Sequence, residues 1–259
     1  MSAVPLHSTV DGPEDAPVLV LGSSLGTTGA MWRFQLPALA QRLRVVRYDH
    51  RGHGASPVPP GPYTVADLGA DVIALLDRLG VRRCHLGGAS LGSAVALWVA
   101  AHHPDRVDRL VLAGTAAVFG TPEIWRTRAA TVREQGMAAV AATVVDRWLP
   151  PEYAAAHPEH RQELLDAVLA TPVDGYANCC GVLETMDLTA DLANVAAPTL
   201  VITGSEDQSA PPELGRALAA GIRGARLVEI AGAAHLPNVS HAEEFTRLVA
   251  DFLGASRTS

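Results

Sequence analysis

The stretch His85–Trp98, "HLGGASLGSAVALW", predicts a sharp passage from a buried strand into a helix. Within it, residues 88–92 (GASLG) fit the pattern G-x-S-x-G, whose glycines permit a tight, strained turn that exposes the serine hydroxyl. The N-terminus of the helix that follows favours negative charge developing beside that serine. An ordinary strand-to-helix turn is the alternative. Ser90 is therefore a candidate nucleophile whose partners must lie elsewhere in the chain.

Around this stretch, short apolar runs alternate with helical patterns. Gly, Pro or charged residues bound the runs, as is typical of strands buried on both faces. Strands are predicted over 16–22, 42–49, 82–88, 106–114, 197–204 and 225–232, and helices over 65–79, 91–102, 211–220 and 242–253. Thr64 and Asp67 suit the start of the first of these helices. The alternation predicts an α/β fold with a mostly parallel central sheet and helices on both faces.

One long segment interrupts the alternation. Residues 115–191 carry helical patterns, several prolines and no clear strand. We expect this segment to be an inserted helical cap over the C-terminal edge of the sheet, where open α/β folds bind ligands. The predicted domains are thus a core formed by residues 1–114 and 192–259, and the cap formed by residues 115–191.

Composition narrows the possible functions. The chain has 259 residues, 48% of them hydrophobic, and a net charge of −7, which argues against a nucleic-acid partner. All 20 basic residues are Arg, which excludes lysine Schiff-base chemistry and the P-loop lysine. No apolar run reaches the ~18 residues of a membrane span, and the first residues lack the pattern of a signal peptide. We expect a cytoplasmic protein that has no membrane partner.

A base and an acid for Ser90 follow the last two predicted strands. Asp207 lies in the loop after the first of these strands, with Glu206 as a rival one residue earlier. His235 lies in the loop after the second, with His241 as a rival that adjoins the final helix. A serine hydroxyl needs an imidazole to take its proton and a carboxylate to orient that imidazole. We expect Ser90, Asp207 and His235 to form a catalytic triad.

An oxyanion intermediate on Ser90 would need two hydrogen-bond donors. The backbone N–H of Leu91, directly after the candidate nucleophile, is the first predicted donor. The second should come from the small Gly/Ser-rich loop in residues 21–32, "LGSSLGTTGAMW". Leu25 is favoured and Ser24 is the alternative, and an ordinary glycine turn is the competing interpretation of the loop.

Other reactive side chains are expected to be structural. His50 and His53 lie in a glycine turn that follows a strand. Cys84, Cys179 and Cys180 have neither the spacing of zinc ligands nor that of a disulfide framework. They are expected to be free thiols in a reducing cytosol, and the adjacent pair is expected to pack in the interior.

Several segments resemble the α/β-hydrolase superfamily: "YDHRGHGASPVPPGPYT", "GASLG", "PTLVITGSEDQSAPP" and "GAAHLPN". Within it, the chain is most similar to the 3-oxoadipate enol-lactonases. The loop "SSLGTTGAMW" resembles their N-S-L-G-T-x-x-x-W segment, and the cap segments "RAATVREQGMAAVAATVVDRWLP" and "LDAVLATPVDGYANCC" are also similar. The chain departs at Ser23, where the family has Asn, and at Ser93, where relatives tend to have a second glycine.

The resemblance implies an α/β-hydrolase fold and a serine hydrolase of the β-ketoadipate pathway of aromatic catabolism. Its reaction would add water to 3-oxoadipate enol-lactone and release 3-oxoadipate through an acyl-enzyme, without a cofactor or a metal. An anionic substrate of an acidic protein then needs a local cation. The cap offers Arg126, Arg128 and Arg133 near Trp125.

We expect Arg128, Trp125, Ser24 and Trp32 to contact this substrate. A solvated helix face is the alternative for the arginines, and core packing is the alternative for Trp32. Two other functions remain open. One is another α/β-hydrolase activity, that of a carboxylesterase, a perhydrolase or a carbon–carbon bond hydrolase, and the other is a ligand receptor that retains the triad. The sequence leaves the oligomeric state open.

Overall fold

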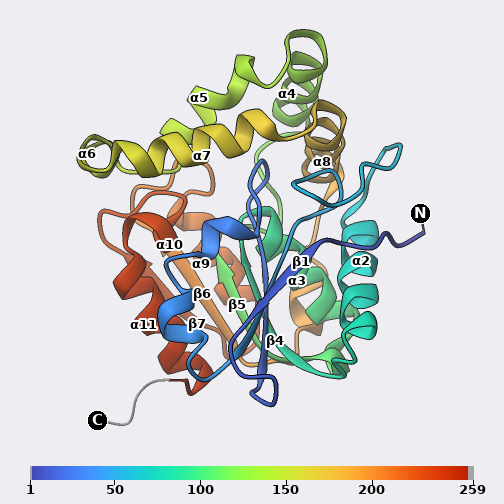
Figure 1. Cartoon of the computed structure of the whole chain (residues 1–259), viewed down its shortest axis with the longest axis vertical. Coiled ribbons are helices and arrows are strands. Elements are labelled where there is room, and N and C mark those ends of the chain that lie inside the picture. Colours follow the sequence, from blue (N-terminus) through green and yellow to red (C-terminus); the bar gives the residue numbers. More distant parts are fainter. Residues whose placement is uncertain (1, 256–259) are drawn as a thin grey trace.

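A seven-stranded sheet forms the centre of the computed structural model, which describes residues 2–255 (Figure 1). In spatial order the strands are β1 (Ser8–Asp11), β3 (Arg44–Tyr48), β2 (Val18–Gly22), β4 (Cys84–Ala89), β5 (Val107–Ala113), β6 (Thr199–Gly204) and β7 (Arg226–Ile230). Only the pairing of β1 with β3 is antiparallel among these strands. The predicted α/β class with a mostly parallel sheet is confirmed.

The apolar runs become strands because the sheet is covered on both faces. All side chains of β4 and β6 are buried, as expected for central parallel strands. Strand β1 was not predicted, because its four residues, STVD, have neither an apolar run nor a buried face. It forms as an edge strand through backbone pairing with β3. Edge strand β7 is also more exposed than its apolar run predicted.

Helices pack on the two faces of the sheet. Helices α2 (Val65–Arg78) and α3 (Leu91–His102) pack together on one face (Figure 1). Helix α11 (Ala242–Leu253) packs with the short α1 (Leu36–Leu39) on the other. Thr64 and Asp67 form a reciprocal capping box at the start of α2, as predicted. No helix within residues 2–255 is both long and apolar enough to traverse a membrane.

The remaining helices and turns complete the core. They are α9 (Pro212–Gly221), α10 (Pro237–Ser240) and the 3-10 turns η1 (Gly29–Trp32), η2 (Pro104–Arg106) and η3 (Leu192–Asn194). The predicted bounds of α3 and α11 match the structure, and α9 begins one residue later than predicted.

Five helices lie between β5 and β6 in the chain and cover one end of the sheet (Figure 1). They are α4 (Pro122–Gln135), α5 (Ala138–Asp146), α6 (Pro151–Ala156), α7 (Pro158–Ala170) and α8 (Val173–Thr185). Helices α4 and α8 pack against each other along much of their length. The division of the chain into a core and a cap over 115–191 stays a prediction. Residues 1 and 256–259 of the predicted core lie outside the described residues.

Helix α8 sits directly on the turn that follows β3. A Cβ added to Gly175 would lie 2.1 Å from the carbonyl oxygen of Gly52, so the two backbones approach too closely for any side chain. Gly52 also has a φ of +80°, which favours glycine. Next to this contact, the Cys179 thiol donates to the Arg51 carbonyl at 3.7 Å. These contacts fix the height of α8 above the sheet.

Candidate active site

Ser90 lies where β4 ends and α3 begins, at the centre of the sheet. Strand β4 pairs in parallel with β2, and the chain order reverses between these two strands. The loops after β2 and β4 therefore leave the same sheet edge side by side, at the topological switch point where such folds bind ligands. This topology explains why Ser90 and the loop that starts at Ser23 become neighbours.

The turn at Ser90 is strained. Its φ of 54° and ψ of −117° make it the one non-glycine residue with a positive φ within residues 2–255. A Cβ on Gly88 would lie 2.4 Å from the carbonyl carbon of Gly92. A Cβ on Gly92 would lie 2.3 Å from the carbonyl carbon of Gly22. Both glycines of the motif are thus required by close backbone contacts. Such strain persists only where the surroundings enforce it, and it is common at functional sites.

Ser93, a departure from the family pattern, braces this turn. Its buried hydroxyl donates to the Gly88 carbonyl at 2.6 Å and accepts the Ala113 N–H at 2.9 Å. The N–H of Ser90 in turn donates to the Ala113 carbonyl at 2.8 Å. The hydroxyl therefore ties both sides of the turn to β5.

Asp207 and His235 meet in the buried interior. Nδ1 of His235 lies 2.8 Å from Oδ2 of Asp207, and both side chains are almost fully buried. The other oxygen, Oδ1, accepts the N–H groups of Ser209 at 2.7 Å and Ala210 at 2.9 Å. Since a carboxylate only accepts, the proton of this pair sits on Nδ1 and leaves Nε2 of His235 as a potential base.

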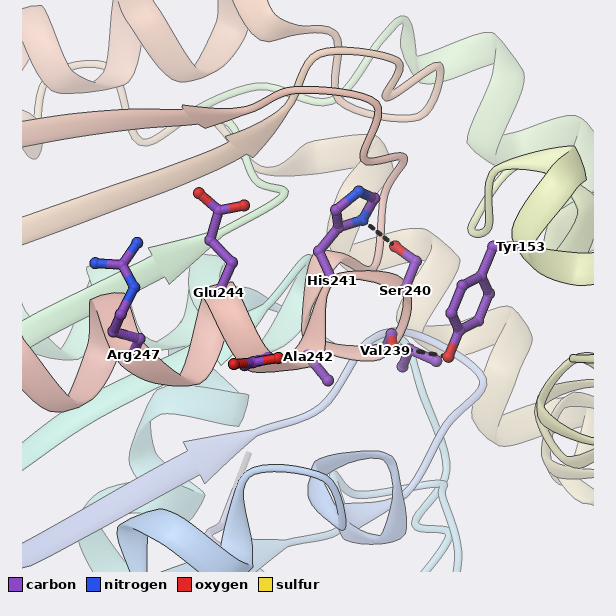
Figure 2. Close-up of a pocket in the computed structure, with 8 residues that line it drawn as sticks. Tyr153, Val239, Ser240, His241, Ala242, Glu244 and Arg247 are labelled. Carbon is purple, nitrogen blue, oxygen red and sulfur yellow. Dashed lines mark hydrogen bonds between the residues drawn. The ribbon is translucent and has the colours of Figure 1, made fainter. Parts of the chain in front are cut away.

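The rival acid and base occupy other positions. Glu206 is exposed. His241 precedes α11, and its Nδ1 lies 3.0 Å from the Ser240 hydroxyl. Figure 2 shows this pair on a surface pocket that shares no lining residue with the cavity around Ser90. The structure thus brings Asp207 to His235 rather than to His241.

A narrow cavity joins residues of the sheet edge to residues of the helices above it. From the sheet side it is lined by Ser24, Leu25, Ser90, Ser209 and His235. From the helical side it is lined by Phe119, Trp125, Arg128, Val144, Trp148, Tyr176 and Leu183. We call the first set the floor and the second set the roof. The predicted nucleophile, base and substrate contacts Ser24, Trp125 and Arg128 therefore share one cavity.

The loop after β2 brings a backbone donor without an acceptor, that of Leu25, to the cavity. The N–H of Ser24 points at Sδ of Met31 at 3.4 Å, and that of Gly26 donates to Nε2 of His53 at 2.9 Å. Between them, the N–H of Leu25 donates to no atom of the described residues. Leu91 is the first residue of α3, where N–H groups have no partner within the helix. Of the two predicted alternatives, the geometry therefore favours Leu25 over Ser24.

Two histidines hold this loop from behind, a role that the sequence did not suggest. Nε2 of His50 lies 3.0 Å from the Ser23 carbonyl, to which it must donate. Nε2 of His53 accepts the Gly26 N–H, so its proton lies on Nδ1, 3.3 Å from the Arg51 carbonyl. Burial lowers the pKa of His50 to about 3 and that of His53 to about 4. Both rings are therefore neutral at neutral pH, as these hydrogen bonds require.

Among the cap arginines, Arg128 is the one that lines the cavity. Its guanidinium lies over the Trp125 ring, 4.6 Å from the centroid, and Nε1 of Trp125 donates to the Phe119 carbonyl at 2.6 Å. In contrast, Arg126 pairs with two glutamates, and Arg133 donates to the Asn178 amide oxygen.

The roof also holds a second polar group. The hydroxyl of Tyr176 is buried and has no hydrogen-bond partner within the described residues. Burial raises the pKa of Tyr176, so the hydroxyl keeps its proton. Arg128 lies close enough to act on that pKa in the opposite direction. Tyr176 was not among the predicted substrate contacts, although it stands in the segment "DGYANCC".

Other predicted or considered side chains lie away from the cavity. Trp32 is in the core, where its ring packs 6.1 Å from that of Phe245. It ends the turn η1, which directs the indole toward α11 instead of toward Ser90. Cys179 and Cys180 are fully buried free thiols that do not line the cavity, and neither does the buried Cys84 at the start of β4. Burial raises the pKa of Cys180 to about 12.

Comparison with known proteins agrees with this architecture. A family model described as alpha/beta hydrolase fold matches residues 17–242. The chain is 37% identical over 246 residues to 3-oxoadipate enol-lactonase 2 of Acinetobacter baylyi, covering 95% of this chain and 92% of the relative. It is 33% identical over 267 residues to a protein of Variovorax paradoxus provisionally named carbamate hydrolase RutD, covering 96% of both chains.

Among solved structures, the enol-lactonase of Burkholderia xenovorans LB400 superposes with a TM-score of 0.94 at 41% identity, covering 96% of both chains. These likenesses extend across the core and the helices above it. The chain is therefore a hydrolase that belongs to the α/β-hydrolase fold family.

Proposed function

We propose that the protein is a serine hydrolase that opens a small anionic lactone, 3-oxoadipate enol-lactone, with water to give 3-oxoadipate. The observation that carries the proposal is that Ser90, His235 and Arg128 line one cavity. If these residues act as nucleophile, base and cation, the lactone carbonyl and the carboxylate of one small molecule could reach all three. Similarity to named enol-lactonases over nearly the whole chain supports this substrate.

In the first half of the reaction, Nε2 of His235 takes the proton of the Ser90 hydroxyl. The Ser90 oxygen then adds to the lactone carbonyl carbon, and the carbonyl oxygen becomes an oxyanion. The N–H groups of Leu25 and Leu91 stabilise this oxyanion, a contribution of about 3 kcal/mol for a single donor in other enzymes. The ring C–O bond breaks, and His235 returns its proton to the leaving enol oxygen.

In the second half, water attacks the acyl-enzyme. His235 removes a proton from the water, whose oxygen adds to the acyl carbon, and the ester bond to Ser90 breaks as Ser90 regains a proton. The enol half of the substrate stays attached to the acyl group and then tautomerises to the ketone. Since ring closure competes with water, hydrolysis would need the acyl chain to be held in place with one ordered water beside it.

The substrate carboxylate would lie against the roof. Arg128 offers a guanidinium that stacks on Trp125, lines the cavity and takes part in none of the ion pairs among the described residues. The Tyr176 hydroxyl offers a donor without an acceptor. A carboxylate bound by both would satisfy the buried hydroxyl and would orient the lactone carbonyl toward the floor.

Steady-state assays of Arg128→Leu test the proposal. On the enol-lactone, we expect kcat/KM to fall by about 10- to 100-fold, mainly through KM, because one charge-assisted contact is lost. On a neutral aryl ester, the same variant should retain its activity. The matched control is Arg126→Leu, two residues earlier on α4, about half a helical turn away and outside the cavity. Strong ester turnover by the wild type without lactone turnover would disprove the substrate assignment.

A second candidate function rests on the RutD relative. Its 33% identity spans nearly the whole chain, and a carbamate carbonyl could occupy the same floor. A carbamate substrate would release an amine or ammonia together with carbon dioxide. Measuring ammonia release from small carbamates beside lactone opening separates the two activities.

A further inference from the structure

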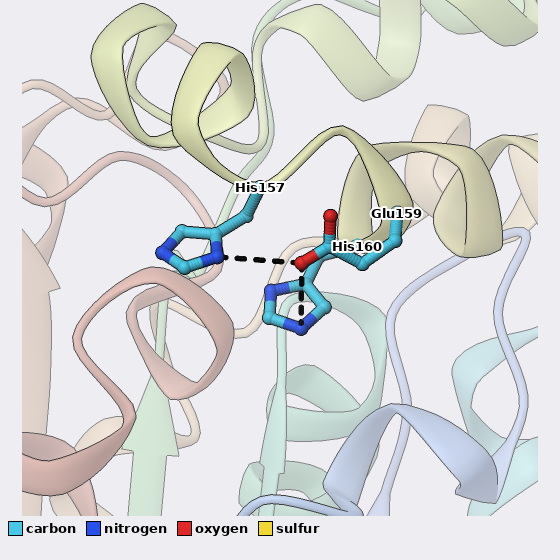
Figure 3. A group of neighbouring side chains, drawn as sticks. All are labelled: His157, Glu159 and His160. Atoms are coloured by element: carbon cyan, nitrogen blue, oxygen red, sulfur yellow. Dashed lines mark hydrogen bonds and ion pairs between the residues drawn. The ribbon is translucent and has the colours of Figure 1, made fainter.

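We propose that His157, Glu159 and His160 form a binding site for one divalent transition-metal ion of the zinc type, on the outer surface of the helices between β5 and β6. These three side chains gather at the start of α7, and none of them lines the cavity around Ser90 (Figure 3). One ligand atom from each lies within 4.8 Å of the other two. No other such group of three occurs within residues 2–255.

The distances suit a metal better than they suit hydrogen bonds. Oε1 of Glu159 lies 3.4 Å from Nδ1 of His157 and 3.7 Å from Nε2 of His160. The first is at the limit of a hydrogen bond and the second is beyond it. Two ligands at ~2.1 Å from a tetrahedral zinc ion are about 3.4 Å apart. The spacing of the carboxylate oxygen between two imidazole nitrogens therefore matches a bridging cation.

Hydrogen bonding on the far side of His160 orients this ring as a ligand. The Tyr153 hydroxyl lies 3.0 Å from the Val239 carbonyl and 2.8 Å from Nδ1 of His160 (Figure 2 shows the first contact). A carbonyl only accepts, so the single hydroxyl proton goes to Val239 and the hydroxyl oxygen accepts from Nδ1–H of His160. In neutral His160, Nε2 then carries a bare lone pair that faces the Glu159 carboxylate. A cation between these two atoms would turn a repulsive contact into two bonds.

The surroundings hold part of the site in place. The His160 ring packs edge-on against Phe34, with ring centroids 4.9 Å apart. Metal-ligating histidines usually donate their second ring N–H to a fixed oxygen, as His160 does to Tyr153. The His157 ring lies nearly parallel to that of His160, at 13°, so it must rotate to direct its lone pair at the metal. Its side chain is 44% exposed, and the rotation would move the ring away from Tyr153, whose ring centroid lies 4.6 Å from that of His157. Water would complete the coordination.

Two imidazoles and one carboxylate select the metal class. Nitrogen ligands favour zinc, nickel, cobalt or copper over magnesium and calcium, which prefer oxygen. The nearby Arg33 weakens the attraction for a cation, but its charge is paired with Glu163. Through Tyr153 the site is tied to the Val239 carbonyl in α10, which begins two residues after His235. A bound ion would therefore fasten α6 and α7 to the loop that carries the proposed base.

Zinc titration of tag-free protein by calorimetry at pH 7.5 tests the site. We expect one zinc ion per chain, and at least tenfold weaker binding in His157→Gln and in Glu159→Gln. Glu159 is exposed and His157 is half-exposed at the surface, so both variants should fold, with a Tm close to that of the wild type in the absence of zinc. His102→Gln is the matched control, since His102 is an exposed helix histidine 3.7 Å from a carboxylate, and its binding should equal that of the wild type.

A fourth variant tests the orientation of His160. Tyr153→Phe keeps all three ligands but removes the oxygen that accepts from Nδ1, and we expect about tenfold weaker zinc binding. At one zinc concentration near the wild-type Kd, zinc should raise the Tm of the wild type and of His102→Gln more than that of the other three variants. The proposal is overturned if the wild type takes up no zinc, or if His157→Gln or Glu159→Gln binds it as tightly as the wild type. Unchanged affinity in Tyr153→Phe would refute the assigned proton position.

Discussion

The floor and the roof of the cavity around Ser90 are built in different ways. Hydrogen bonds fix the groups that position the floor: Asp207, which accepts from His235, accepts three of them, and both sides of the Ser90 turn are tied to β5. In the roof, most lining side chains are apolar, Arg128 is held by stacking on Trp125, and the Tyr176 hydroxyl has no partner. The floor is preorganised for one kind of chemistry, whereas the roof is left adaptable to a substrate.

This difference predicts that removing a floor residue abolishes turnover, while removing a roof residue changes selectivity. The largest effect is expected for Ser90→Ala, which should lower kcat by about 10⁴-fold or more on every ester or lactone that the protein turns over. The measurement is single-turnover kinetics with the enol-lactone and an aryl ester. Wild-type rates in this variant would refute the nucleophile assignment, and ligand binding by the wild type without any turnover would favour a receptor.

Acid should destabilise the fold through the two buried histidines that contact the loop of Leu25. The pKa values of His50 and His53 are lowered to about 3 and about 4 by burial, below the ~6.5 of an unfolded histidine. The unfolded chain therefore binds more protons below pH 6.5, and stability is lost as the pH falls from about 6.5 toward 4. Each histidine should contribute about 1.4 kcal/mol per pH unit over that range. Urea unfolding from pH 7 to pH 5 measures the slope, and the double variant His50→Gln/His53→Gln should flatten it.

A smaller effect on kcat is expected for His53, which contacts the loop of Leu25. His53→Leu leaves the Gly26 N–H without its acceptor and should lower kcat about tenfold, with little change in KM, because Leu25 loses its orientation. His53→Gln restores an acceptor and should recover part of the rate. A change confined to Tm, with kcat intact in both variants, would show that His53 supports only the fold.

The smallest effects are expected for Trp125 and Trp32, which were both predicted from the sequence to contact the substrate. Trp125→Phe loses the Nε1 bond to Phe119 and part of the stacking with Arg128, so the KM for an anionic lactone should rise about three- to tenfold at constant kcat. Trp32→Phe removes core volume beside Phe245 and should lower Tm by a few degrees without changing KM. Equal effects on KM in both variants would place Trp32 at the site after all.

The sequence predicted the floor of the cavity better than it predicted the roof. The floor was predictable because strand order and loop order determine it: G-x-S-x-G follows one parallel strand, and Asp207 and His235 follow two others, so all three emerge at one sheet edge. The roof was harder, because helical periodicity does not say which side of a helix faces the cavity. Arg126, Arg128 and Arg133 looked alike in the sequence, and only the packing of α4 against α8 distinguishes them.

A local sequence pattern also does not reveal hydrogen-bond partners that are distant in the chain. His50 and His53 read as residues of a glycine turn, and only the folded chain brings them to the Ser23 carbonyl and the Gly26 N–H. Strand β1 was missed for a related reason. Its pairing with β3 is made by backbone groups, which carry no signal in a pattern of side chains.

The contact of Gly175 with Gly52 has a consequence for anyone who exchanges segments between members of this family. His50 and His53, which contact the loop of Leu25, lie within two residues of Gly52 in the chain. The same short segment of backbone therefore supports both α8 and that loop. A helical segment transplanted from a relative would need a glycine at the position facing Gly52. With any other residue there, the transplanted helix would lie farther from the sheet or displace the turn at Gly52. An exchange meant to alter substrate selectivity would then also lower kcat.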